Sequence, residues 1–282
     1  MQPEETRIQQ LYPLQQREVS VAGLYLQHHL HRKGSKEHPF VYTNYVSTLD
    51  GRIALGYPHS AHTSIPPGIT SELDRRLYQE LAAQADVLLT SGRYLRQLSE
   101  GKAQHPPPIS DEYPDLLQWR LDQVMKRQPA VVILSRSLDL PLTTLTSLKR
   151  KVYVATGSDA DKHRLARIAD SGTSILFSGE GKEVEGCELI ADLGMMGYTS
   201  IYSIAGPALL NTLLRAGKVD RLYLTQVHMI FGGEKYDTLL EGPLLNPAAR
   251  FCLDSLYYDK GEPGRPPQSF AVFGKAGVTN DG

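Results

Sequence analysis

Three segments of the sequence join an apolar run to a turn whose residue types could bind phosphate. In Ala205-Gly206-Pro207 a small residue lets the backbone approach a pyrophosphate, and proline suits the first position of the helix that follows. Thr90-Ser91-Gly92-Arg93 adds hydroxyl groups and a guanidinium to a second turn. Ser135-Arg136 forms the third turn, and a guanidinium can bind a phosphate through two hydrogen bonds. The chemistry that these residue types suggest is the binding of a dinucleotide through its phosphates.

The position of the three turns along the chain supports this interpretation. Each turn follows a strand-like run, and open α/β sheets bind ligands at the carboxyl ends of their strands. A helix that begins after Gly206 also offers free N–H groups to anionic oxygens. A hydroxyl beside an arginine, as in Ser135-Arg136, suits the ribose 2′-phosphate that distinguishes NADPH from NADH. One such turn alone is more often ordinary loop chemistry, but the three together predict a dinucleotide site with NADPH as the cofactor.

A fourth segment, Asn44-Tyr45-Val46-Ser47-Thr48-Leu49-Asp50-Gly51, begins as a strand and ends in a turn. Asn44 and Thr48 share one face of the strand, because successive strand residues point to opposite sides. We therefore expect Asn44 and Thr48 on the floor of a substrate pocket, with Asp50 near the reacting centre as the catalytic residue. The alternative is that Asp50 only caps the turn, as Asx residues routinely do.

The elements that must position these residues alternate between strand and helix periods from Phe40 onward, which is typical of an α/β sheet. Strands are expected at 40–46, 87–90, 130–134, 152–155, 200–204 and 222–227, and an antiparallel pair at 250–258 and 268–274. Helices are expected at 71–85, where Ser71 and Asp74 form a cap, at 115–126, from Ser158 to about 169, and from Pro207 to Gly217. Residues 1–38 are polar and weakly periodic, so we expect an N-terminal arm that packs on a domain of residues 39–282 or on a partner subunit.

The composition argues against several classes of protein. The formal net charge of −1 over 282 residues disfavours a nucleic-acid partner, because phosphate-backbone binding normally needs an excess of Lys and Arg. Two cysteines without CxxC spacing predict neither a disulfide framework nor a zinc-thiolate site. The cluster His28, His29 and His31 has no carboxylate or cysteine at ligand spacing, so no metal is expected. A secretory signal and an apolar run of the ~20 residues that span a bilayer are both missing, so we expect a cytoplasmic protein without membrane contact.

In this order, the four segments resemble the pyrimidine reductase of riboflavin biosynthesis, which is the dihydrofolate-reductase-like domain of bifunctional deaminase-reductases. That family has Ser-Leu-Asp-Gly after its first strand, and here Thr48 stands in the serine position. Its alanine-aspartate strand is similar to residues 85–92, and its second cofactor strand is similar to residues 131–140. The segment 197–233 carries the most specific likeness, with Ala205-Gly206-Pro207 in place of Gly-Gly-Pro and Phe231-Gly232-Gly233 at its end. The resemblance covers about residues 39–275.

The resemblance implies a mixed, mostly parallel sheet flanked by helices, a homodimer, and hydride transfer from NADPH to the sugar C1′ of 5-amino-6-(5-phosphoribosylamino)uracil. It implies that Asn44, Thr48 and Asp50 face the nicotinamide and the substrate. The cofactor contacts that it implies are Thr90, Ser91, Gly92, Arg93, Ser135, Arg136, Ala205, Gly206, Pro207, Ala208 and Leu209. The sequence has no His-x-Glu followed by Pro-Cys-x-x-Cys, so zinc-dependent deamination is not expected.

Three departures from the family pattern concern the substrate more than the cofactor. Ile204 replaces an acidic residue, Ala205 replaces the first glycine, and a segment containing His105-Pro106-Pro107-Pro108 replaces the substrate loop after Arg93. Two alternatives therefore stay open: an NADPH-dependent reductase of another small heterocycle, such as dihydrofolate, and a dinucleotide-binding protein without turnover. A structural dimer module without a cofactor is disfavoured by the arginines at two strand ends.

Overall fold

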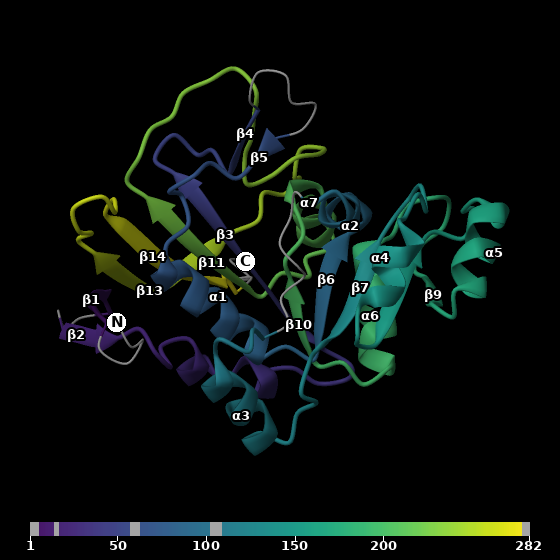
Figure 1. Ribbon diagram of the computed structural model, residues 1–282, viewed down its shortest axis with the longest axis horizontal. Helices are drawn as coiled ribbons and strands as arrows, with labels where there is room; N and C mark the ends of the chain where they lie inside the picture. Colours follow the sequence, from purple (N-terminus) through teal and green to yellow (C-terminus); the bar gives the residue numbers. More distant parts are fainter. Residues whose placement is uncertain (1–5, 14–16, 57–62, 102–108, 278–282) are drawn as a thin grey trace, which may run out of the picture.

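A mixed β-sheet is the framework of the molecule (Figure 1). The computed structural model describes residues 6–13, 17–56, 63–101 and 109–277. In these ranges the sheet contains β1 (Arg7–Tyr12), β2 (Arg17–Ser20), β3 (Phe40–Thr48), β6 (Val87–Ser91), β7 (Ala130–Leu134), β8 (Val152–Thr156), β9 (Ser174–Phe177), β10 (Ser200–Ser203), β11 (Arg221–Val227), β13 (Phe251–Asp259) and β14 (Gln268–Lys275). Their order in space is β2-β1-β13-β14-β11-β3-β10-β6-β7-β8-β9.

The strands from β11 to β9 run parallel to one another, whereas β14, β13, β1 and β2 pair antiparallel. The chain moves outward from β3 through β6, β7 and β8 to β9, and then returns to insert β10 between β3 and β6. Connections on the two sides of such a reversal lie on opposite faces of the sheet, and the strand ends at the reversal form the usual ligand site of open α/β sheets.

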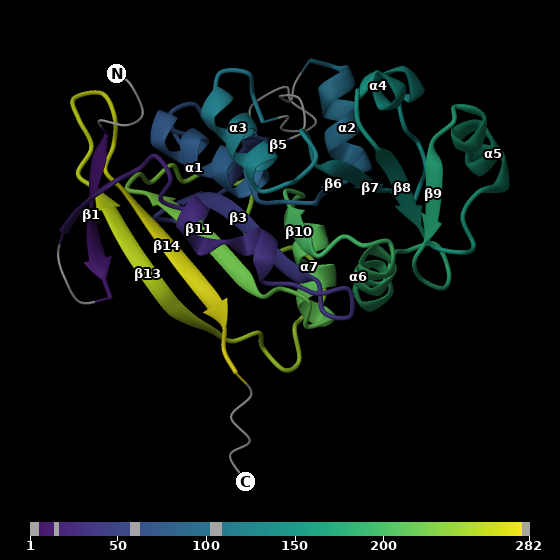
Figure 2. The same cartoon turned by 90° about the horizontal axis from the view of Figure 1, so that it is seen from below.

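Helices cover both faces of the sheet, which gives three layers (Figure 2). One face carries α1 (Glu72–Ala83), α2 (Gly92–Ser99), α4 (Leu142–Ser147) and α5 (Lys162–Asp170), with α3 (Pro114–Asp122) packed against α1. The other face carries α6 (Gly186–Met195) and α7 (Pro207–Arg215). Each face has its own apolar core, and the central strands contribute to both, because parallel strands between two helix layers are buried on both sides.

The expected α/β class, with a mostly parallel sheet flanked by helices and a C-terminal antiparallel pair, is confirmed. β7 has the expected bounds, β3 continues to Thr48, and β10 ends at Ser203. The cap of α1 is also confirmed, since the Ser71 hydroxyl accepts a hydrogen bond from the Asp74 N–H at 3.1 Å. The apolar runs were good guides because burial on both faces demands them.

The predicted start of the helix after Ser158 is wrong. α5 begins at Lys162, and the Asp161 carboxylate accepts a hydrogen bond from the Arg164 N–H at 2.9 Å. Ser158 lies in the preceding turn, where its N–H donates to the Gly179 carbonyl at 2.9 Å. Serine and aspartate are both common helix caps. Asp161 is the cap here because it lies three residues before Arg164, whose N–H has no partner within the helix.

The N-terminal arm is continuous with the sheet in the residues that the structure describes. β1 pairs with β13 at the edge of the sheet, and β2 pairs with β1. Farther along the arm, the Glu80 carboxylate of α1 accepts hydrogen bonds from the N–H groups of Gly23 and Tyr25, at 2.6 and 2.9 Å. The arm therefore packs on the domain through both backbone and side chains, whereas the division at residue 38 stays a sequence-based prediction.

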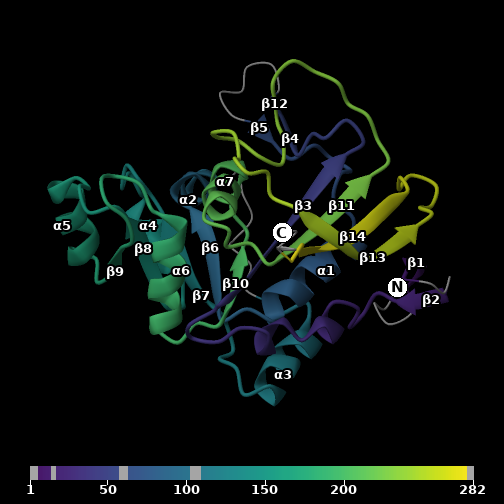
Figure 3. The same cartoon turned by 180° about the vertical axis from the view of Figure 1, so that it is seen from behind.

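A small second sheet lies over the carboxyl edge of the main sheet (Figures 1 and 3). Its order is β12 (Tyr236–Asp237), β4 (Ala54–Gly56) and β5 (Thr63–Ser64). It joins the turn after β3 to the loop after β11, because β4 pairs antiparallel with β12. The Pro-rich segment around His105 lies outside the described residues. Of the helices in the described ranges, none has the length and apolar character that crossing a membrane requires.

Candidate active site

The four predicted segments meet at one edge of the main sheet. Asn44 to Asp50 lie in β3 and the turn after it, and the other three segments follow β6, β7 and β10. These strands are parallel neighbours, so their carboxyl ends lie at the same edge. The structure therefore brings together residues that are up to 160 positions apart in the chain, as the hydrogen bond from the Tyr45 hydroxyl to the Ala205 carbonyl shows.

The turns after β6 and β7 are packed directly against each other at Gly92. A Cβ atom at this position would lie 3.0 Å from the Ser135 hydroxyl and 2.9 Å from Leu140. Ser91 begins α2 by accepting a hydrogen bond from the Tyr94 N–H at 3.3 Å. Gly92 is thus required by the approach of the two turns, and the Ser91 hydroxyl is already used as a helix cap.

Ser135 and Arg136 are neighbours with different surroundings. Ser135 is buried, and its hydroxyl accepts a hydrogen bond from the Leu138 N–H at 3.0 Å. Arg136 is exposed and lines a cavity. Thr90, at the end of β6, has a buried hydroxyl without a hydrogen-bond partner among the described residues. Of this group, Arg136 has the position best suited to contact a phosphate in solution.

The turn after β10 leaves open space where a ligand could lie. Gly206 precedes α7 with a φ of −71°, which any residue can adopt, and no side chain of the described residues caps the helix. A Cβ atom at Gly206 would meet nothing within 4 Å. The Leu209 N–H already bonds to the Gly206 carbonyl at 3.1 Å, whereas Ala208 is exposed beside Pro207. Glycine here provides room beside a helix N-terminus rather than a special backbone angle, which fits a pyrophosphate.

Arg93 points to the small sheet instead of to Arg136. Its guanidinium donates to the Thr63 hydroxyl at 3.0 Å and lies 3.7 Å from the Asp237 carboxylate. Thr63 in turn donates to Asp237 at 2.6 Å. Arg93 therefore connects α2 to the small sheet above the site, and its half-exposed side chain keeps one side open to solvent.

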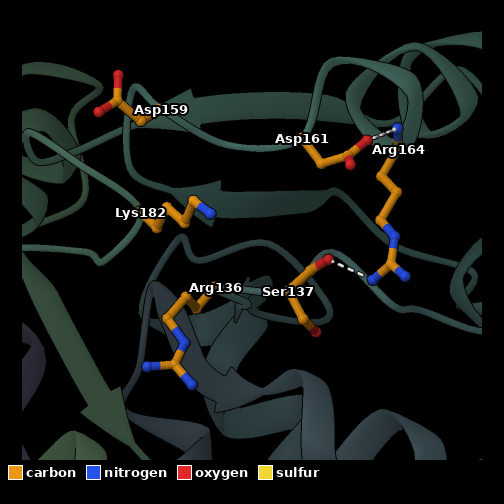
Figure 4. Close-up of a pocket in the computed structure, with 6 residues that line it drawn as sticks. All are labelled: Arg136, Ser137, Asp159, Asp161, Arg164 and Lys182. Carbon is orange, nitrogen blue, oxygen red and sulfur yellow. Dashed lines mark hydrogen bonds between the residues drawn. The ribbon is translucent and has the colours of Figure 1, made fainter.

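A cavity of about 260 Å³ lies beyond the ends of β7, β8 and β9 (Figure 4). Arg136, Ser137, Asp159, Asp161, Arg164 and Lys182 line it. Three cationic side chains face two carboxylates, and Asp161 already serves as the cap of α5. A cavity of this charge at the carboxyl edge of the sheet suits a phosphate group.

The cations of the cavity are held in different ways. The Arg164 guanidinium donates to the Ser137 carbonyl at 2.7 Å, as Figure 4 shows. Arg136 turns away from Arg164 and forms an ion pair with Glu183 at 2.9 Å, with both side chains about 70% exposed. Such an exposed pair is weak and can exchange its carboxylate for a phosphate at little cost. Sequence reasoning identified Arg136 but missed Arg164 and Lys182, because only the order of β7, β8 and β9 brings them together.

Asp50 is the centre of a hydrogen-bond network between the turn after β3 and the loop after β11. Its carboxylate accepts hydrogen bonds from the Thr48 hydroxyl, the Arg52 guanidinium and the Gly232 N–H, the last at 2.9 Å. The Thr48 hydroxyl is the main cause of a pKa that is lowered to about 2, and the Gly232 N–H and Arg52 act in the same direction. An acid this strong is ionised at neutral pH, so it is suited to positioning and to charge stabilisation rather than to proton transfer.

The two glycines of the loop after β11 allow this network. Gly232 and Gly233 have φ angles of 69° and 93°, which residues with a side chain rarely adopt. With these angles the Gly232 N–H reaches Asp50 while the Gly233 carbonyl accepts a hydrogen bond from Arg52 at 3.1 Å. The Phe231-Gly232-Gly233 motif thus has a local physical reason.

We expect Asp50→Asn to loosen the loop after β11 and to lower the stability of the folded protein. An amide cannot accept all the hydrogen bonds of the carboxylate, and we expect an unfolding free energy lower by on the order of 1 kcal/mol at pH 7. Since folding lowers the pKa of Asp50 from 3.8 to about 2, its stabilising effect should be lost as the pH falls from about 4 to about 2. Urea unfolding of both proteins across this pH range checks the prediction, and a stability difference independent of pH would contradict it.

Asn44 is held by a neighbouring strand. Its side-chain oxygen accepts a hydrogen bond from the Tyr202 hydroxyl of β10, and the Tyr202 ring stacks on Tyr42 at 4.9 Å between centroids. The hydrogen bond from Tyr202 to the side-chain oxygen therefore fixes the orientation of the Asn44 amide, including its nitrogen. Ile204, one of the departures from the family pattern, packs at the border of the core on the α1 face.

Asp74 is a buried acid close to these segments that no sequence motif marks as a candidate site residue. It lies in the first turn of α1, is buried, and accepts a hydrogen bond from the Thr225 hydroxyl of β11 at 2.7 Å. Burial raises its pKa to about 6. The available signal was its spacing, since Asp74 shares the buried face of α1 with Leu77 and Leu81, and a carboxylate on an apolar stripe needs a reason.

In the described ranges, no group of three or more His, Cys, Asp or Glu side chains is arranged to hold a metal ion. The donors at the carboxyl edge are instead N–H groups, hydroxyls and guanidinium groups, which suit a phosphorylated organic ligand. The open space beside Gly206 and the cationic cavity both lie at this edge, and each suits a phosphate group.

A comparison with protein families gives a match from residue 39 to residue 257 with the RibD C-terminal domain. This chain belongs to the RibD C-terminal domain family. A curated relative, the riboflavin biosynthesis protein RibD of Bacillus amyloliquefaciens, is 25% identical over 209 residues, which is 72% of this chain. The chain spans about half of that relative, namely 49% of its length.

Solved structures show that the RibD C-terminal domain fold is present. A pyrimidine reductase-like protein of Corynebacterium diphtheriae is similar with a TM-score of 0.62 and 16% identity, over 86% of this chain and 93% of that one. Acinetobacter baumannii RibD is similar with a TM-score of 0.56 and 18% identity, over 84% of this chain and 58% of that one. The riboflavin biosynthesis reductase of Saccharomyces cerevisiae has a TM-score of 0.53 and 15% identity, over 90% of this chain and 99% of that one.

Proposed function

We propose that this protein is an NADPH-dependent reductase whose substrate is 5-amino-6-(5-phosphoribosylamino)uracil. The observation that carries the proposal is the family match over residues 39–257, and it is supported by a strand edge whose residue types suit phosphate and that adjoins the Asn44 to Asp50 segment. The bound cofactor would supply a hydride to the sugar C1′ of the substrate. The rest of the chemistry is orientation and electrostatics from the protein.

Different parts of the edge would hold different parts of the ligands. The turn at Gly206 would hold the pyrophosphate beside the N-terminus of α7, and the cationic cavity would hold the 2′-phosphate through Arg136, Arg164 and Lys182. Asn44 and the Asp50 network would lie on the substrate side, where Asp50 fixes the loop after β11. Thr90 and Ser91 at the end of β6, Arg93 of α2 and Ser135 in the turn after β7 would support these contacts.

Assembly and location belong to the same proposal. We expect a homodimer, as is typical of the family. Both cysteines, Cys187 and Cys252, are exposed and unpaired, which suits a reducing compartment such as the cytoplasm.

Titration of NADPH and NADH into the purified protein, followed by NADPH oxidation with the aminouracil ribosyl phosphate, tests the function. We expect tight and selective NADPH binding and turnover that depends on the substrate. NADPH binding without turnover would favour the reductase of another heterocycle or a binding protein without catalysis, and Ile204 near the site is the residue to examine then. Equal, weak binding of both nucleotides would contradict the cofactor assignment.

A further inference from the structure

Asp74 is a buried carboxyl group at the site edge of the sheet, and no cationic side chain of the described ranges pairs with it. Only 8% of the residue is exposed. Its Oδ1 accepts the hydrogen bond from Thr225, whereas Oδ2 has no hydrogen-bond partner among the described residues. A carboxyl group in this state is costly to ionise and has one oxygen available for a ligand.

The sheet register places Asp74 beside the predicted substrate residues. Thr225 of β11 lies opposite Val46 of β3, and Asn44 and Thr48 flank Val46 on the same face of that strand. The first turn of α1 packs on this face, so the carboxyl group lies over the strands that carry Asn44 and Thr48. In the described ranges, the two other acids with a raised pKa are already used, because the buried Glu80 pairs with Arg76 and the half-buried Asp220 accepts the Val41 N–H.

The ionisable groups that face Asp74 come from three elements. They are Tyr25 of the arm, Tyr78 of α1 and Tyr202 of β10, and burial raises the pKa of each well above its usual value. All three are therefore neutral wherever Asp74 titrates, and no charged side chain contributes to its own shift. Burial and the Thr225 hydroxyl alone set the proton affinity of this group.

We propose that Asp74 is the acid that gives a proton to the substrate nitrogen during reduction. The inference rests on the proposed function. In the ring-opened ribosylamine, the carbon of the C1′=N bond gains the hydride, and the π electron pair of that bond moves to nitrogen. Nitrogen forms its new N–H bond with the proton from Oδ2, which leaves a carboxylate that accepts the Thr225 hydroxyl and regains its proton from water.

The test compares Asp74→Asn, Thr225→Val and the control Glu72→Gln, which changes an exposed acid of the same helix turn. For the wild type we expect kcat to fall as the pH rises above about 6, because the acid form is the active one. Asp74→Asn should lower kcat by roughly 10²–10⁴-fold and remove this pH dependence. Thr225→Val should shift the fall to higher pH, since it removes a donor that stabilises the carboxylate. Glu72→Gln should match the wild type.

Infrared difference spectra provide a readout that needs no substrate. The wild type should show a protonated carboxyl band at pH 5 that disappears near pH 6 and is missing in Asp74→Asn, and both proteins should bind NADPH with equal affinity. An unchanged rate and pH profile in Asp74→Asn, or an ionised Asp74 at pH 5, would overturn the inference. NADPH binding without turnover in the wild type would overturn the proposed substrate, and the infrared titration would then decide on the acid separately.

Discussion

On the proposed function, removing the three cations of the cavity is expected to abolish the preference for NADPH over NADH. In the Arg136→Ala/Arg164→Ala/Lys182→Ala variant the 2′-phosphate loses its charge-assisted hydrogen bonds, whereas the pyrophosphate turn at Gly206 is untouched. Each such bond contributes about 1.5–3 kcal/mol, less where solvent screens it, so we expect NADPH affinity to fall on the order of 100-fold with little change for NADH. Arg136→Ala alone should lower NADPH affinity only about 10-fold.

Fluorescence titration with both nucleotides measures the two affinities. The matched control is Arg167→Ala, which removes an exposed cation from α5 that does not line the cavity. Glu183→Gln gives the opposite test, because it releases Arg136 from its ion pair and should strengthen NADPH binding. Parallel losses for NADPH and NADH in the triple variant would show that the cavity does not read the 2′-phosphate.

The largest loss of stability is expected from Arg120→Ala. This side chain is 1% exposed and donates hydrogen bonds to the carbonyls of Ala83, Ala85 and Lys126, at 2.7–2.8 Å. These hydrogen bonds satisfy the backbone carbonyls at the end of α1 and in the turn before β6, which are shielded from water. Truncation leaves the buried carbonyls of Ala83 and Ala85 and the part-buried carbonyl of Lys126 without this donor, and it leaves a cavity, so we expect about 3–5 kcal/mol lower unfolding free energy.

Urea unfolding of Arg120→Ala and of Arg127→Ala checks this prediction. Arg127 is exposed and pairs with the exposed Asp111, so its removal should change stability by about 0.5 kcal/mol or less. Arg120→Met separates the two causes, because it fills the space without making the hydrogen bonds. A loss below about 1 kcal/mol in Arg120→Ala would mean that water reaches these carbonyls.

The sequence predicted the centre of the fold better than its edges. Runs such as Ala130–Leu134 are apolar throughout because helices cover both faces of β7, so their pattern is unambiguous. β1 was missed because only half of its residues, Arg-Ile-Gln-Gln-Leu-Tyr, are apolar, and they form a strand through pairing with β2 and β13. Whether this segment forms a strand depends on a distant partner, so the local sequence alone does not predict it.

The candidate site divides in the same way. Arg136 and Gly206 could be predicted because strand-end turns have a local signature. Lys182 and Arg164 could not, because they follow different strands and meet only through strand order. The sequence indicated Asp74 only as part of a helix cap. Its proposed role depends on the hydrogen bond with Thr225, which is 151 residues away.

The pairing of the two ends of the chain has a consequence for its synthesis. Gln9 of β1 lies opposite Tyr258 of β13, so the edge of β1 that faces away from β2 has no partner until synthesis has passed residue 258. At about 5–20 residues per second, this delay lasts on the order of ten seconds or more. A strand that waits so long in solvent is a hazard for intermolecular pairing. The arginines, glutamines and glutamate of β1 and β2 suit this wait, because charged and polar side chains keep an unpaired edge soluble until the C-terminal hairpin arrives.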